Sequence, residues 1–223
     1  MSKTHNQIEV VVSSDFICPW CWVGQRRLTA GIEMARLTTP PIVRYQPYEI
    51  NPAMPLEGMS RRLYRSAKLG SWARSQAMDA EVQLAGRELA AEFNFDLIDI
   101  TPNTRLAHRL MFLARAEGIV DRAEALQESI FRAYFTEGRD IGSLDVLVIL
   151  AAANGFDPVA TRLSLLGPAG ESEVVAIETQ TQSEGIRSLP VVRINGTQVS
   201  GAQPAAVLAE ALRAAVAKAD ALH

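Results

Sequence analysis

The sequence predicts an α/β protein with strands near both ends of the chain and a long helical segment between them. β-Branched apolar runs alternate with one helical stretch over residues 8–46, and Asn195-Gly196 separates two further strand-like runs. Ala, Leu, Glu, Arg and Gln dominate the middle of the chain, as is typical of helices. We therefore expect residues 1–58 and 186–223 to form one domain with a four-stranded sheet, and residues 59–185 to form an all-helical insertion domain.

The N-terminal part predicts a strand–helix–strand unit. Residues 8–13 are a β-branched run of strand length, and Pro19 suits the first turn of a helix over residues 19–36. Pro40-Pro41 ends that helix, and residues 42–46 predict the second strand. Because crossovers between parallel strands are right-handed, the helix should cover one face of the sheet.

The middle of the chain predicts a series of short helices, separated by glycine or asparagine and turn-forming residues. They are expected near residues 59–68, 72–92, 103–117, 122–135, 143–153, 158–165 and 171–184. Because such short helices cannot each bury a face alone, we expect one compact bundle. Asn195-Gly196 then predicts a hairpin of residues 191–194 and 197–200, and Pro204 begins a last helix over residues 205–219.

Composition excludes several classes of function. The chain has 223 residues, with 22 basic and 25 acidic side chains and a net charge of −3, whereas nucleic-acid-binding domains normally show a basic excess. No apolar stretch approaches the ~20 residues that a membrane-spanning helix needs, and the polar N-terminus does not resemble a signal peptide. We expect a cytoplasmic protein with no nucleic-acid or membrane partner. The oligomeric state stays open, with a homodimer as one alternative.

The only two cysteines concentrate the candidate chemistry in Cys18-Pro19-Trp20-Cys21. Cys18 lies where a strand gives way to a helix, so the free amides of the first turn and the positive end of the helix dipole face its sulfur and favour the thiolate. Cys21 lies one turn further on, close enough to form a disulfide and deeper inside. We expect Cys18 to attack as the exposed thiol and Cys21 to resolve. Pro19 should stiffen the turn, and Trp20 should offer an apolar surface to a substrate.

A zinc site is the main alternative for a Cys-x-x-Cys pair. Structural zinc needs four ligands, and only His5, His108 and His223 remain beside the cysteines. Two cysteines in a cytosolic chain indicate reactive chemistry or metal binding, because the cytosol keeps structural thiols reduced. A Cys-x-x-Cys pair between a strand and a helix is typical of redox sites. We therefore expect no metal and no cofactor, with glutathione as an alternative co-substrate.

Residues 15–24, DFICPWCWVG, resemble the DsbA family of thioredoxin-fold oxidoreductases, and specifically its FrnE-like branch. Residues 48–55, 102–110 and 200–204 fit the same branch, so the resemblance spans nearly the whole chain. It implies a thioredoxin-like fold (βαβ…ββα) with an all-helical insertion domain between the second and third strands. It also implies thiol–disulfide exchange with a disulfide-containing protein or a small thiol or disulfide.

The resemblance implies further site residues. Pro190 precedes a strand, where thioredoxin-like proteins place a cis-proline opposite the redox helix, although only ~5–6% of such bonds are cis in general. By this analogy Pro190 belongs to the catalytic site, and the backbone of Leu189 pairs with an incoming peptide or glutathione. Many relatives carry Val or Thr at this position, so their substrate preference does not carry over. Asn51, in the second matching stretch, is another candidate substrate-binding residue.

Three charged or titratable features outside the motif have two interpretations each. Asp15 could shuttle a proton to or from Cys21, or could cap the turn through its side chain. His108 could face the active-site cleft and contact substrate, although most lone helical histidines are structural. The basic group Arg61–Arg65 could attract an anionic thiol, but a solvated helix face is the simpler account.

The sequence leaves three functions to distinguish. Dithiol–disulfide exchange is the first. The second is a glutathione-dependent isomerase or transferase of the 2-hydroxychromene-2-carboxylate isomerase or kappa glutathione transferase type. Those proteins place a serine where Cys18 stands, so the intact pair argues against this function. The third is a non-catalytic, redox-sensitive binding protein, which would turn over no model disulfide.

Overall fold

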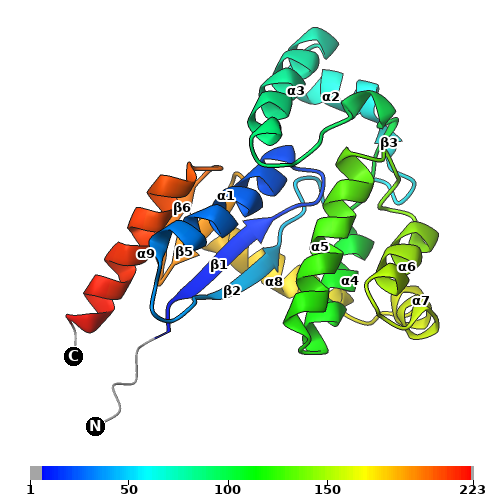
Figure 1. Ribbon diagram of the computed structural model, residues 1–223. Coiled ribbons are helices and arrows are strands. Elements are labelled where there is room, and N and C mark those ends of the chain that lie inside the picture. The colour runs from blue at the N-terminus through cyan, green and yellow to red at the C-terminus, as the bar shows by residue number, and fades with distance from the viewer. Residues whose placement is uncertain (1–6, 222–223) are drawn as a thin grey trace.

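The computed structural model describes residues 7–221 as a mixed α/β fold (Figure 1). Its main sheet has the order β2-β1-β5-β6, with β1 (Glu9–Ser14), β2 (Ile42–Pro47), β5 (Val191–Ile194) and β6 (Thr197–Ser200). β1 pairs parallel with β2 and antiparallel with β5, which pairs antiparallel with β6. The predicted four-stranded sheet, with a strand–helix–strand unit and a hairpin, is confirmed.

Two helices from opposite ends of the chain cover one face of this sheet. α1 (Pro19–Ala35) and α9 (Ala205–Asp220) lie side by side in front of it in Figure 1. Gly31 allows their close approach, because a Cβ there would lie 3.0 Å from the Cβ of Leu208. α8 (Glu171–Ser183) packs against β2 from behind in the same view. The N-terminus of α1, and with it both cysteines, therefore lies at the end of the sheet where β1 ends.

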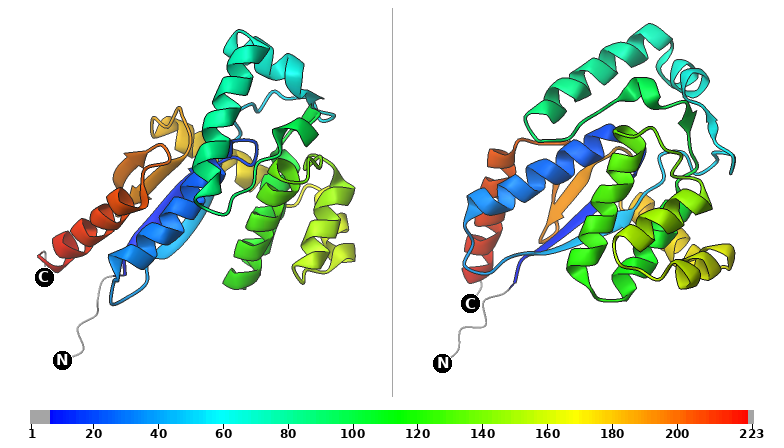
Figure 2. Two further views of the ribbon diagram at one scale, coloured as in Figure 1. Left: turned by 45° about the horizontal axis from the view of Figure 1, so that its top comes forward. Right: turned by 45° about the vertical axis from the view of Figure 1, so that its right-hand side comes forward.

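The helical insertion forms two groups of helices instead of the predicted single bundle. α2 (Arg61–Leu69) and α3 (Trp72–Arg87) pair with each other and lie beyond the N-terminal end of α1 (Figures 1 and 2). The second group lies beside the sheet and includes α8. Its other helices are α4 (Arg105–Ala116), α5 (Val120–Phe135), α6 (Leu144–Ala153) and α7 (Pro158–Leu166). The segments that join the two groups contain β3 (Met59–Ser60), the 3₁₀ helix η1 (Phe95–Leu97) and β4 (Ile100–Thr101), and β3 pairs antiparallel with β4.

The end of α3 explains part of this division. The helix stops at Arg87, before the predicted end near residue 92, because the following residues turn back onto it. The backbone N–H of Ala91 donates to the carbonyl of Gly86 at 3.1 Å, and the ring of Phe93 occupies the place where a Cβ on Gly86 would lie. The composition of residues 88–92 favours a helix, so the end of α3 could not be predicted from composition. It follows from the packing of the Phe93 ring against Gly86.

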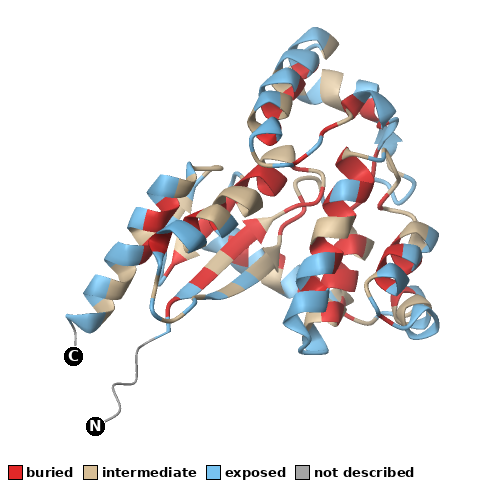
Figure 3. Ribbon diagram, viewed as in Figure 1, coloured by how far each residue is buried: buried red, intermediate tan, exposed pale blue. Residues whose placement is uncertain are grey.

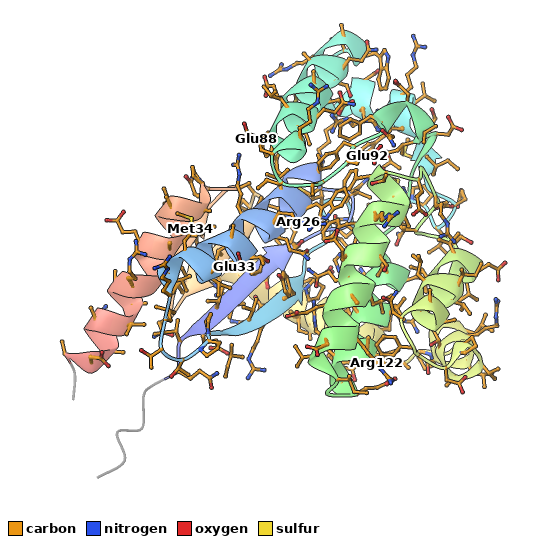
Figure 4. All side chains as sticks on the ribbon, in the orientation of Figure 1. Arg26, Glu33, Met34, Glu88, Glu92 and Arg122 are labelled. Atoms are coloured by element: carbon orange, nitrogen blue, oxygen red, sulfur yellow. The ribbon has the colours of Figure 1, made fainter. Side chains whose placement is uncertain are left out.

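An aromatic cluster joins the start of α1 to the insertion. The indole of Trp22 stacks on Phe131 and Phe135 of α5, with ring centroids 6.2 and 6.0 Å apart. Its Nε1 donates to the Glu128 carboxylate at 3.1 Å, and Arg26 forms an ion pair with the same carboxylate. Figure 4 shows Arg26 between α1 and α5.

Buried residues form two main apolar clusters (Figure 3). One joins the sheet to α1 and α9, and the other joins the redox turn and the start of α1 to α5 and other parts of the insertion. The predicted domain boundaries at residues 58 and 186 therefore stay a prediction, since one apolar core includes residues from both sides of them. Between residues 7 and 221, no helix is long and apolar enough to cross a membrane.

Candidate active site

The Cys-Pro-Trp-Cys motif forms the first turn of α1. Cys18 is the N-cap residue, with φ −92° and ψ 107°, and Pro19 is the first helical residue. The fixed φ of proline suits this position, and its missing N–H costs no hydrogen bond there. The N–H of Cys18 donates to the carbonyl of Asp15 at 3.2 Å, and the N–H of Cys21 donates to the carbonyl of Cys18 at 3.0 Å. Both cysteines are free thiols in this structure.

The two thiols differ in their surroundings. Cys18 is 7% exposed and lines a cavity, whereas Cys21 is 2% exposed and lies inside the aromatic core. The expected open exposure of Cys18 is therefore wrong, because its sulfur lies within a cavity. Burial and the neighbouring Cys18 sulfur raise the pKa of Cys21 well above its usual value, while the Asp15 backbone and the Ser14 side chain oppose the shift. Cys21 therefore keeps its proton in the dithiol form.

Pro190 lies against the redox helix through a cis peptide bond. The Leu189–Pro190 bond is cis, as the resemblance implied. A Cβ on Gly24, one turn after Cys21, would lie 2.9 Å from Cγ of Pro190, so only glycine admits the proline this close. The carbonyl of Pro190 accepts from the N–H of Gly201 at 2.8 Å, which anchors it beside β6.

Asp15 and His108 contact each other beside the redox turn. Asp15 is 1% exposed, and its Oδ2 accepts a hydrogen bond from the N–H of Ile50 at 2.7 Å. Its Oδ1 lies 3.3 Å from Nε2 of His108, which is also buried and packs on the ring of Phe16 with centroids 5.1 Å apart. Asp15 thus holds the loop after β2 against the redox turn. The structure places His108 away from the cavity that contains Cys18; it lines a second cavity, of about 230 Å³.

The cavity beside Cys18 has a volume of about 180 Å³. Cys18, Pro19 and Trp20 form part of its lining, and contact of Pro19 and Trp20 with a substrate stays a prediction. The remaining lining comes from the residue before Cys18, from the loop after β2, from α2 and α3, from η1 and β4, and from the C-terminal end of α5. Those residues are Ile17, Ile50, Arg61, Tyr64, Arg65, Lys68, Leu69, Met78, Val82, Phe95, Thr101, Tyr134 and Phe135.

Besides His108, two candidate substrate-binding residues, Asn51 and Leu189, lie outside this lining. Asn51 is half-buried, and its carbonyl accepts a hydrogen bond from the N–H of Met54 at 3.0 Å. Only its neighbour Ile50 reaches the cavity. Leu189 is half-buried and packs on both apolar clusters beside it. Substrate binding by Asn51, by Leu189 and by His108 stays a prediction.

The simpler account of Arg61–Arg65 as a solvated helix face is wrong for its two ends. Arg61 is buried, and Nη2 of Arg61 and Nη2 of Arg65 donate to the two carboxylate oxygens of Asp79 at 2.7 and 2.8 Å. Arg62 is exposed and does not line the cavity. The spacing of the basic residues predicts one helix face, but Asp79 on the next helix could not be recognised as their partner.

Comparison with known proteins identifies the family. The model of the DSBA-like thioredoxin domain matches residues 9–213, which include both cysteines and Pro190. The chain belongs to this family. The predicted thioredoxin-like fold class and the DsbA family are therefore confirmed, while the FrnE-like branch stays a prediction.

Solved structures agree with this assignment. A "probable DsbA oxidoreductase" from Streptomyces coelicolor is 28% identical, with a TM-score of 0.86 over 95% of this chain and 91% of that one. A 2-hydroxychromene-2-carboxylate isomerase is 13% identical, with a TM-score of 0.69 over 96% and 99%. The cytosolic disulfide reductase DsbM from Pseudomonas aeruginosa, with GSH, is 16% identical, with a TM-score of 0.60 over 96% and 98%. The last two likenesses show a shared fold.

Proposed function

We propose that this protein exchanges dithiols and disulfides through Cys18 and Cys21. The observation that carries the proposal is the arrangement of one thiol at the N-cap of α1, facing a cavity, above a buried thiol one turn later. The Cys18 thiolate attacks one sulfur of a substrate disulfide, the first substrate thiol leaves, and a mixed disulfide forms. Cys21 then attacks the Cys18 sulfur, the second substrate thiol leaves, and the protein holds the disulfide. The reverse sequence transfers the disulfide to a substrate dithiol.

The neighbouring residues have roles that follow from their contacts. Cys21 must lose its proton before it can attack, and burial disfavours this loss. We assign Asp15, which is buried beside the redox turn, the task of accepting that proton. His108 contacts the Asp15 carboxylate and positions it. Pro190 packs against α1 at Gly24 and shapes the substrate side of the site.

The substrate is a disulfide-containing protein or a small disulfide. Glutathione is a candidate co-substrate, and the presence of GSH with the cytosolic reductase DsbM supports testing it first. The chemistry needs no metal and no cofactor, since the two sulfurs carry both electrons. A cytoplasmic location fits a chain whose two cysteines are reserved for exchange.

Trapping tests this proposal directly. A Cys21→Ser protein, treated with bis(2-hydroxyethyl) disulfide, should retain one mercaptoethanol adduct on Cys18, because no resolving thiol remains. Mass spectrometry of the intact protein and of its peptides detects the adduct and its position. A Cys18→Ser, Cys21→Ser protein is the matched control. Absence of an adduct on Cys18, together with no oxidation of the wild-type dithiol by the same disulfide, would overturn the proposal.

The isomerase alternative makes the opposite prediction for Cys18. If a Cys18→Ser protein keeps full activity on a glutathione-dependent isomerase or transferase substrate, the alternative replaces our proposal. If that activity is absent while the wild-type protein reacts with disulfides, exchange is the function.

A further inference from the structure

One face of α2 is turned to the cavity that contains Cys18. Arg61, Tyr64, Arg65 and Lys68 all line this cavity. They recur at spacings of three and four residues, so they share one face of the helix. The α2 sequence, RRLYRSAKL, contains no acidic residue. Three cationic side chains and one tyrosine therefore line the same cavity as Cys18.

Positive charge at this cavity exceeds negative charge. Asp79 is the carboxylate that pairs with Arg61 and Arg65, so it serves two guanidinium groups, and it does not itself line the cavity. Lys68 donates to the hydroxyl of Tyr64 at 2.9 Å and has no ion-pair partner within residues 7–221. In that same range, no acidic side chain lines the cavity. This local excess contrasts with the net charge of −3 of the whole chain.

Arg65 and Lys68 retain the donors that an anion would need. Arg65 uses Nε on Ser75 at 2.9 Å and Nη2 on Asp79, which leaves Nη1 without a hydrogen bond to the described part of the chain. Burial lowers the pKa of Arg65, which shows that its charge is poorly solvated. A carboxylate in the cavity would compensate that charge. Arg61 differs, because its guanidinium lies over the rings of Phe95 and Trp72 and mainly joins α2 to its neighbours.

The cavity is small and otherwise apolar. Its volume of about 180 Å³ lies below the roughly 300–1,000 Å³ of pockets for drug-sized ligands. Cys18 is 7% exposed, so a disulfide must enter this space before its sulfur can be attacked. These dimensions suit a small molecule better than a disulfide held within a folded protein.

We propose that this cavity selects small disulfides that carry a carboxylate, with Arg65 and Lys68 binding the carboxylate while Cys18 attacks the sulfur. The inference rests on the exchange chemistry proposed above. The substrate disulfide gains two electrons and two protons and leaves as two thiols. The cysteine pair loses them and becomes a disulfide, so one turnover of the dithiol protein needs no further reactant.

Single-turnover oxidation by three disulfides of different charge tests the inference. The reduced protein is mixed with excess 3,3′-dithiodipropionate (anionic), bis(2-hydroxyethyl) disulfide (neutral) or cystamine (cationic). Remaining thiols are blocked with N-ethylmaleimide and counted by mass spectrometry. Each rate constant is divided by that of the same disulfide with dithiothreitol, which removes differences in intrinsic reactivity. The wild-type protein should favour the anionic disulfide over the neutral one, and the neutral one over the cationic one.

Lys68 is the residue to change, because it is exposed and its loss should not disturb folding. Lys68→Gln should lower the normalised rate with the anionic disulfide by roughly three- to tenfold and leave the neutral one unchanged. Lys68→Glu should lower it further and raise the rate with cystamine. Lys218→Gln, an exposed position on α9, makes the same change in net charge and should leave all three rates unchanged.

The outcomes separate the two proposals. Equal normalised rates for the three disulfides, or Lys68 variants that behave like Lys218→Gln, would overturn the carboxylate site while exchange through Cys18 stands. If the wild-type protein reacts with none of the disulfides, the exchange function itself fails, and this inference fails with it.

Discussion

Replacing Glu49 by Gln should remove a loss of stability that we expect as the pH rises toward neutrality. Glu49 follows β2 and is 2% exposed. Its Oε1 accepts from Nε of Arg105, its backbone N–H donates to Glu178 at 2.9 Å, and its Oε2 is buried without a hydrogen bond within the described chain. Burial and the neighbouring Glu178 carboxylate raise the pKa of Glu49 to about 7, against the opposing effect of Arg105.

The sign follows from comparing the folded and unfolded chains. In the unfolded chain a glutamate titrates near 4.3, so the folded protein binds this proton more tightly. Its stabilising contribution is complete below about pH 4 and is lost as the pH rises through about 7. Each pKa unit corresponds to ~1.36 kcal/mol, and Glu178 shares part of the titration, so we expect a change of roughly 2–3 kcal/mol.

Urea unfolding at several pH values between about 5 and 8 measures this change. The free energy of unfolding of Glu49→Gln, relative to wild type, should rise by roughly 2 kcal/mol across this range. Glu171→Gln is the matched control, because Glu171 binds the same Arg105 while its side chain is 43% exposed. A difference between Glu49→Gln and wild type that stays constant with pH would refute the reasoning.

Three further predictions concern the redox helix and its surroundings. Gly24→Ala should lower the free energy of unfolding, measured with urea, by roughly 1–2 kcal/mol and slow oxidation of the dithiol, because the new methyl group meets Pro190. Thr29→Ala, on the exposed face of α1, is the control and should do neither. Asp15→Asn keeps an acceptor for the Ile50 N–H but cannot take a proton, so Cys21 should resolve a mixed disulfide on Cys18 at least tenfold more slowly. Stopped-flow mixing measures this rate, and an unchanged rate would make Asp15 a structural residue only. Phe131→Ala should cost roughly 3–5 kcal/mol of unfolding free energy, since the ring is fully buried against Trp22, and a cost below about 1 kcal/mol would contradict the packing.

Local signals made the redox turn and the hairpin predictable. Pro19 both begins α1 and places Cys18 at its N-cap, so two adjacent residues determine the position of the reactive sulfur. Asn195 and Gly196 have φ values of 44° and 82°, the left-handed conformation that a two-residue hairpin turn requires of both residues. Neither feature depends on distant parts of the chain.

The features that depend on contacts between helices were not predictable in the same way. Helical periodicity groups Arg61, Arg65 and Lys68 on one face, but it does not say that the face meets Cys18 instead of water. The partner carboxylate, Asp79, lies on the following helix. Likewise, the ring of Phe93 ends α3 by packing against Gly86, against the helix-favouring composition of the intervening residues.

The stacking of Trp22 on α5 has a consequence for engineering. Trp22 immediately follows the resolving cysteine, and its ring lies between the redox helix and Phe131 and Phe135 of the insertion. The helical insertion is therefore not a replaceable module. A chimera that grafts another insertion onto this thioredoxin-like scaffold would have to supply new aromatic neighbours for Trp22. Otherwise it would expose the sulfur of Cys21 to water and alter the chemistry of the Cys-Pro-Trp-Cys motif, although none of its four residues had been changed.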